Sequence, residues 1–173
     1  MGISSFIKRK YLGNNGRRIT KYYVKKGAKI GKNFKCTYIP SFGSEPYLIE
    51  IGDDCYCATN VTFITHDGGT RVINNLNNTE YDRILPIKIG NNVFLGKNST
   101  IMPGVTIGDN VIVGYGSIVT KSIPSNEVWA GIPAKKICTL DEYIEKNHYV
   151  FKNTKHMNYE EKKKFYIGLY EDK

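Results

Sequence analysis

An aliphatic residue returns every six positions through the middle of the chain. These residues share the first place of a hexapeptide whose fifth place is small or aliphatic, and they are Ile89, Leu95, Ile101, Ile107, Val113 and Val119. A weaker copy of the pattern lies upstream at Ile51, Cys57 and Phe63, and a fainter one at Val24, Ile30 and Cys36. A period of six fits neither the 3.6-residue turn of an amphipathic helix nor a continuous two-residue alternation. The chain must therefore turn after each short strand.

Three such strands make one triangular coil, in which residues 18 apart stack at the ~4.8 Å spacing of hydrogen-bonded strands. We expect the first and fifth positions of each hexapeptide to point into the prism. Glycine and asparagine are expected at the corners, because they tolerate the dihedral angles required there. The sequence therefore predicts an all-β fold, a parallel β-helix of hexapeptide repeats.

The repeat is interrupted between Phe63 and Ile89. The intervening residues, about 64–88, are polar and glycine-rich, so we expect them to leave the prism as a loop, and loops longer than about 12–15 residues are usually functional or disordered. This loop begins with His66, the only histidine before position 148. A neutral imidazole can accept a proton from an attacking hydroxyl or amine, which makes His66 a candidate general base. From the residues alone, a surface histidine without a catalytic role is an equally good interpretation of His66.

Beyond Pro133 the pattern becomes helical. Thr139 with Glu142, and Asn158 with Glu161, have the spacing of N-terminal capping boxes, so we predict two short C-terminal helices. A further short helix is expected to begin near Ser4 or Ser5. We divide the chain into a basic arm (1–23), a β-helix (24–137) and a helical tail (138–173).

Composition narrows the class of protein. The 173 residues suit one domain, and 40% hydrophobic residues with a mean hydropathy of -0.38 exclude a disordered or membrane-spanning chain. Residues 1–35 hold 11 Lys and Arg and no acidic residue, which suits an anionic membrane surface, an acidic substrate or plain solvation. No nucleic-acid module is present, so we expect no nucleic-acid partner. The first ten residues lack a secretory signal, and a cytoplasmic location is expected.

The cysteines are interpreted as reduced. No C-x-x-C motif occurs, and three of the four cysteines fall at or near inward positions, where a small core residue is favoured over a metal ligand; the four are Cys36, Cys55, Cys57 and Cys138.

The hexapeptides and the closing segment Gly131-Ile132-Pro133-Ala134-Lys135 resemble the hexapeptide-repeat acyltransferases. The similarity is strongest to galactoside, maltose and streptogramin O-acetyltransferases and to the sugar O-acetyltransferases of surface polysaccharide synthesis. It implies a left-handed β-helix, a homotrimer, acetyl-CoA as acyl donor, and direct acetyl transfer with His66 as catalytic base. No metal is expected, because the γ-type carbonic anhydrases of similar fold need three zinc-binding histidines and the repeat contains only His66.

The resemblance also implies a groove for the pantetheine arm between neighbouring subunits. The positions that match cofactor-binding positions of the family are Gly96, Lys97, Gly114, Tyr115, Thr120, Lys121 and Lys135. Two of them depart from the galactoside enzymes, since Lys97 replaces a serine and Tyr115 replaces an alanine. At Lys97 only the contact through the backbone N–H is carried over.

The acceptor is predicted to be a sugar or glycan hydroxyl, held by Asn74, Asn75, Tyr81 and Asp82 of the loop. Solvation of the loop explains these polar residues equally well. Three alternatives remain open: N-acetylation of an amino sugar or its nucleotide derivative, O-acetylation of an antibiotic, and a non-catalytic β-helix scaffold. The group that orients His66 is also open, because Asp67 can be either its partner or an exposed turn residue, and a backbone carbonyl can serve as well.

Overall fold

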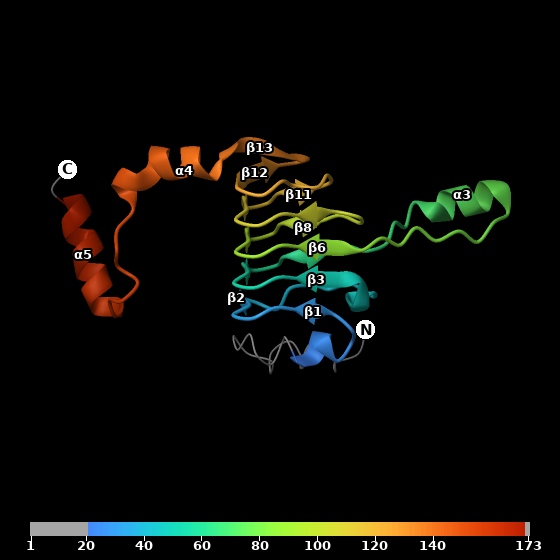
Figure 1. Ribbon diagram of the computed structural model, residues 1–173, viewed down its shortest axis with the longest axis horizontal. Helices are drawn as coiled ribbons and strands as arrows, with labels where there is room; N and C mark the ends of the chain where they lie inside the picture. The colour runs from blue at the N-terminus through green and yellow to red at the C-terminus, as the bar shows by residue number, and fades with distance from the viewer. Residues whose placement is uncertain (1–20, 172–173) are drawn as a thin grey trace. The chain divides into compact units, whose positions relative to one another are not determined.

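Short parallel strands stack into a triangular β-helix (Figure 1). The computed structural model describes residues 21–171. Sheet A contains β1 (Lys29–Ile30), β3 (Ile49–Ile51), β6 (Ile87–Ile89) and β9 (Thr106–Ile107). Sheet B contains β2 (Lys35–Cys36), β4 (Tyr56–Cys57), β7 (Phe94–Leu95), β10 (Ile112–Val113), β12 (Glu127–Gly131) and β13 (Ala134–Thr139). Sheet C contains β5 (Thr62–Phe63), β8 (Thr100–Ile101) and β11 (Ile118–Val119).

The register confirms the predicted stacking of residues 18 apart. Ile112 pairs with Phe94, and Ile118 pairs with Thr100. In the first coil the paired residues are 21 apart, as in Ile30 with Ile51, so this coil contains three extra residues. Val24 does not belong to the repeat, because it lies in a helical turn at residues 21–24 and is 46% exposed.

The inward positions of the hexapeptides form the core. The first-position residues from Cys36 onward and the fifth-position residues of the regular hexapeptides are buried as predicted, including Ile101, Val105, Ile107 and Val111, whereas Ile30 is only partly buried. Cys36, Cys55 and Cys57 are free thiols within this core, in agreement with their interpretation as small buried residues. Burial raises the pKa of the Cys36 thiol to about 11, which keeps it protonated and unreactive at neutral pH.

Asparagine turns the chain at the corners. Asn33, Asn60, Asn92, Asn98, Asn110 and Asn126 have φ angles between 53° and 63°, a left-handed conformation that asparagine tolerates better than most residues. Their amides also bond along the prism: Asn92 donates to Asn110 at 2.9 Å, and Asn110 donates to Asn126 at 3.0 Å. The corner residues therefore both turn the chain and join successive coils.

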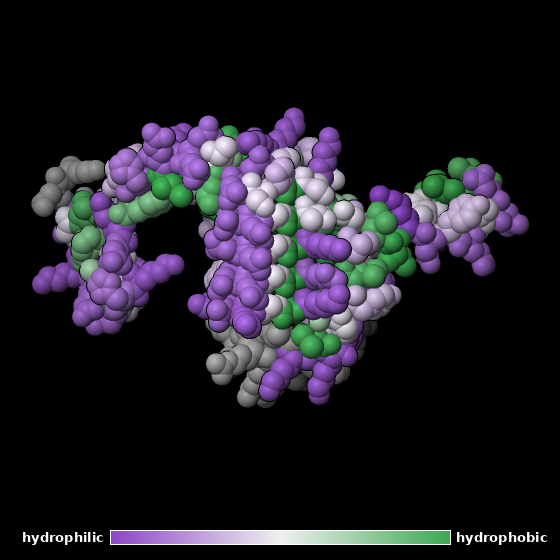
Figure 2. All heavy atoms as spheres, viewed as in Figure 1, coloured by the Kyte–Doolittle hydropathy of each residue, from purple (hydrophilic) through white to green (hydrophobic). Residues whose placement is uncertain are grey.

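The interruption of the repeat is an arm, residues 64–86, that projects from the prism (Figure 1). Its root is a short antiparallel ladder in which Leu85 N–H donates to Thr65 at 2.8 Å and Asp67 N–H donates to Arg83 at 3.0 Å. The expectation of a loop needs correction, because the arm contains helix α3 (Thr70–Asn77). The apolar residues of α3 are exposed, with Leu76 79% accessible, and Figure 2 shows hydrophobic surface on the arm.

The chain ends in helices whose start signals were visible in the sequence. Helix α4 (Leu140–Asn147) begins with reciprocal hydrogen bonds between Thr139 and Glu142, at 2.7 and 3.2 Å. Helix α5 (Tyr159–Glu171) begins with the same pair of bonds between Asn158 and Glu161, at 2.8 and 3.0 Å. Two 3₁₀ turns, η1 (Pro46–Leu48) and η2 (His148–Val150), complete the elements.

The helix expected near Ser4 or Ser5 lies outside the described residues. Within residues 21–171, no helix combines the length and the apolar character needed to cross a bilayer. In the same part of the chain, no three His, Cys, Asp or Glu side chains are grouped in a way that suits a metal ion.

Candidate active site

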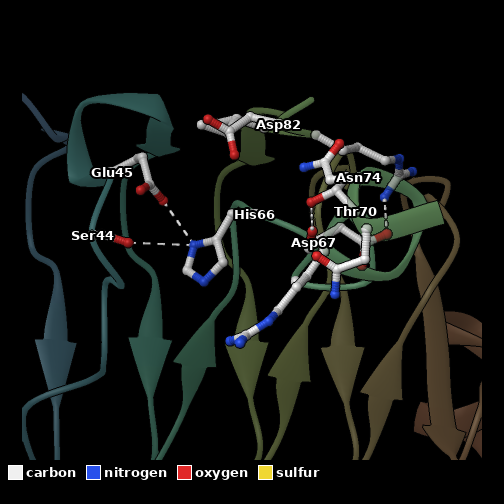
Figure 3. Close-up of a pocket in the computed structure, with 12 residues that line it drawn as sticks. Ser44, Glu45, His66, Asp67, Thr70, Asn74 and Asp82 are labelled. Carbon is white, nitrogen blue, oxygen red and sulfur yellow. Dashed lines mark hydrogen bonds and ion pairs between the residues drawn. The ribbon is translucent and has the colours of Figure 1, made fainter. Parts of the chain in front are cut away.

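His66 lies at the root of the arm, just after β5 brings the chain to the corner between sheets C and A. The ring is half exposed, and its Nδ1 lies 3.0 Å from Glu45 Oε2 and 3.3 Å from Ser44 Oγ. Figure 3 shows the second ring nitrogen, Nε2, on the side turned away from Glu45 and Ser44. With Nδ1–H donating to Glu45, Nε2 carries the lone pair and can accept a proton.

Glu45 is held in place by its own hydrogen bonds. Thr65 Oγ1 donates to Glu45 Oε2 at 2.5 Å, the same oxygen that faces His66. Hydrogen bonds from Thr65, then Ser44 and His66, lower the pKa of the Glu45 carboxyl to about 2. Glu45 is therefore a carboxylate throughout the neutral range, ready to accept Nδ1–H and to stabilise a positive imidazolium.

Glu45 was not among the residues predicted from the sequence. It immediately precedes the turn η1, in the coil that contains the three extra residues. A signal was present, since Ile30 and Ile51 are 21 apart whereas the regular coils, such as the one from Ile89 to Ile107, repeat every 18 residues. The spacing does not say which inserted side chain turns toward His66.

Asp67 is not the partner of His66. Its Oδ1 accepts from the Gly69 N–H at 2.9 Å, and its Oδ2 forms an ion pair with Arg83 at 3.2 Å. The alternative of an exposed turn aspartate therefore describes Asp67, and the orienting group is a carboxylate from the preceding coil.

A cavity of about 580 Å³ opens beside His66. Its walls come from the arm and from the segment before η1, and they include Ser44, Glu45, Thr70, Arg71, Asn74, Asn75, Asp82 and Arg83. Asn75 and Asp82, which were predicted to hold the acceptor, line this cavity. Tyr81 is not part of the wall and is 61% exposed.

The side chain of Asn74 is engaged inside the arm. Its Oδ1 accepts from the Tyr81 N–H at 2.8 Å and from Thr79 Oγ1 at 2.9 Å, while its Nδ2 donates to the Tyr81 carbonyl at 2.9 Å. Asn74 thus closes the turn after α3 and shapes the cavity wall.

The predicted cofactor residues divide between two corners of the prism. Thr120 and Lys121 follow β11, so they stand at the same corner as His66, two coils farther along the prism. Gly96 and Lys97 follow β7, at the corner where sheet B leads into sheet C, and Gly114 and Tyr115 follow β10 at that same corner. Sheet C separates the two corners within one chain. Lys135 lies in β13, where it pairs with Ala130, and Ala130 packs on Gly114, so Lys135 stands near the corner of Gly114 and Tyr115.

Comparison with known proteins identifies the family. The family model "Bacterial transferase hexapeptide (six repeats)" matches residues 86–121. Protein CapG of Staphylococcus aureus is 40% identical over 169 residues, which cover 96% of this chain and 98% of CapG. The chain belongs to the hexapeptide-repeat acetyltransferases. The galactoside O-acetyltransferase of Escherichia coli (strain K12) is 41% identical over 126 residues, or 73% of this chain and 60% of that relative.

Solved structures of the hexapeptide-repeat acetyltransferases agree with the fold. A maltose O-acetyltransferase from Clostridium difficile 630 superposes with a TM-score of 0.62 at 30% identity, over 78% of this chain and 81% of that one. A galactoside acetyltransferase in complex with coenzyme A has a TM-score of 0.54 at 29% identity, over 88% and 79%. The predicted family, its left-handed β-helix fold and its acetyltransferase class are confirmed.

Proposed function

We propose that this acetyltransferase moves the acetyl group of acetyl-CoA to a hydroxyl group of a sugar or glycan, with His66 as the general base. The observation that carries the proposal is the pairing of His66 Nδ1 with Glu45 beside a cavity lined by polar side chains. The names of the galactoside and maltose relatives support a sugar acceptor, and the coenzyme A complex of one relative supports the donor.

The main role of the chain's own residues in this reaction is to remove the proton of the acceptor hydroxyl. Acetyl-CoA supplies an acetyl group already activated as a thioester, so one base is enough. Nε2 of His66 takes the proton of the acceptor hydroxyl as its oxygen attacks the acetyl carbon. Glu45 keeps the other nitrogen protonated and stabilises the imidazolium that forms, as the carboxylate does in a Ser-His-Asp triad. Backbone N–H groups stabilise the oxyanion before the thiolate leaves.

A homotrimer would complete this site. Because sheet C separates the corner of His66, Thr120 and Lys121 from the corner of Lys97 and Tyr115, we propose that neighbouring chains bring the two corners together around the pantetheine arm. The exposed apolar face of α3 is a further surface for such an assembly. Contact of residues 1–35 with an anionic membrane surface, a cytoplasmic location and a role in polysaccharide synthesis remain predictions.

Release of free thiol from acetyl-CoA, measured with a panel of sugars, amino sugars and alcohol-bearing antibiotics, tests the proposal. We expect turnover with hydroxyl acceptors, and a loss of about 10²-fold or more in kcat for His66→Ala. The control is Lys88→Gln. Lys88 is an exposed residue of β6 outside the cavity, so this variant should retain activity. Turnover only with amino acceptors would favour N-acetylation, and absence of both turnover and coenzyme A binding would favour a scaffold.

A further inference from the structure

Arg71 is a cation without a counter-ion in the wall of the His66 cavity. It is the second residue of α3, and its side chain is exposed. Four ion pairs occur among residues 21–171, and none of them involves Arg71. By contrast, Arg83, the other arginine of the wall, is paired with Asp67.

The carboxylates of the cavity do not neutralise Arg71. Glu45 is occupied by Thr65 and His66, and Asp67 is occupied by the Gly69 N–H and by Arg83. The third carboxylate, Asp82, lines the same cavity and forms no ion pair with Arg71. Beside the base, the cavity therefore presents one unpaired guanidinium and one unpaired carboxylate.

These groups suit an acceptor with two kinds of polar group. A carboxylate such as that of Asp82 accepts hydrogen bonds from sugar hydroxyls. A guanidinium has the planar donor geometry that binds a carboxylate or a phosphate through two parallel hydrogen bonds. We infer that the acceptor carries an anionic oxygen group, a carboxylate or a phosphate, that binds Arg71 while one of its hydroxyls lies at Nε2 of His66. This inference rests on the proposed transferase function.

The phosphates of coenzyme A do not account for Arg71. The whole pantetheine arm separates them from the thioester, and the thioester must lie within reach of His66 for transfer to occur. An anion that meets Arg71 in the cavity of His66 therefore belongs to the acceptor.

Matched sets of acceptors test the inference. Each set contains a neutral methyl hexoside, the corresponding methyl hexuronide and the corresponding methyl hexoside 6-phosphate, so that the three members differ only at C6. In the set that is turned over, we expect kcat/KM to be about tenfold or more higher for an anionic member than for the neutral one. The better anionic member identifies carboxylate or phosphate as the group bound.

Arg71→Gln should abolish this preference, raise KM for the anionic acceptor by about tenfold and leave the neutral acceptor and the KM for acetyl-CoA unchanged. Lys88→Gln removes the same charge outside the cavity and should keep the preference. Equal kcat/KM values for neutral and anionic members in the wild type would overturn the inference and leave the transferase proposal standing. An increase in KM for acetyl-CoA in Arg71→Gln would also overturn it. Absence of turnover with every set would overturn both.

Discussion

At the scale of single residues, the contact between Glu45 and His66 determines which nitrogen of the imidazole is free to accept a proton. An imidazole has two nitrogens, and the proton must be on the right one before the other can act as a base. The Glu45 carboxylate, with its pKa lowered to about 2 by hydrogen bonds from Thr65, Ser44 and His66, holds that proton on Nδ1. The orientation of the His66 ring is therefore set by a residue 21 positions upstream.

Glu45→Gln tests this role. The amide can donate to Nδ1 and so favour the tautomer with the proton on Nε2, where it blocks base catalysis, and it cannot stabilise the imidazolium. We expect kcat to fall about 100-fold while KM for acetyl-CoA stays near its wild-type value, measured by thiol release.

The matched control is Glu50→Gln, the same substitution at a partly exposed residue of sheet A that pairs with Lys29. It should leave kcat within about twofold, because exposed ion pairs contribute little. Equal kcat values for Glu45→Gln and wild type would show that the carboxylate does not position His66 for catalysis.

At the scale of elements, the corners of the prism matter as much as the strands. Strands of two or three residues cannot persist alone, so the turn that ends each one must be stable by itself. Asn110 shows how this is achieved, because it adopts φ 56° and its amide also joins the coils on either side through Asn92 and Asn126.

Two substitutions separate these roles of Asn110. Asn110→Gly keeps the left-handed conformation and loses only the amide ladder, whereas Asn110→Ala also incurs the left-handed strain of roughly 1–2 kcal/mol. We therefore expect the alanine variant to have the lower free energy of unfolding, by about 1 kcal/mol, in urea titrations followed by circular dichroism. A more stable alanine variant would contradict the role given to the left-handed corner.

At the scale of the whole molecule, the separation of the two corners predicts active sites shared between chains. His66→Ala removes the proposed base from one corner, and Lys97→Trp is expected to obstruct the proposed cofactor groove at the other. Each variant alone should be nearly inactive. After the two are unfolded and refolded together, about a quarter of the sites in random mixed trimers should combine an intact His66 with an intact groove, and activity should return.

Sedimentation of the mixture should show trimers, and thiol release measures the recovered activity. Refolding each variant by itself is the control. If the mixture contains trimers but recovers no activity, each active site is built within one chain.

The sequence by itself determined the β-helix and the helices of the tail. Within the uninterrupted repeat, Ile89, Leu95 and Ile101 each pair with the residue 18 positions farther on, so the pattern there already contains the rule that stacks the coils. The capping boxes likewise predicted where the two C-terminal helices begin, because both hydrogen-bonding partners lie within four residues of each other in the sequence. The root position of His66 followed from the same repeat, since the arm begins where the pattern stops.

Tertiary structure alone decided the environment of that histidine. Glu45 reaches His66 through the extra residues of the preceding coil, and Asp67, its neighbour in sequence, turns instead to Arg83. Helix α3 was also missed, because its apolar residues face no partner within one chain and polar asparagines dominate the segment. The six-residue period specifies which backbone segments lie side by side. The direction of a side chain in an insertion depends on the residues that pack around it, and no local sequence pattern contains this information.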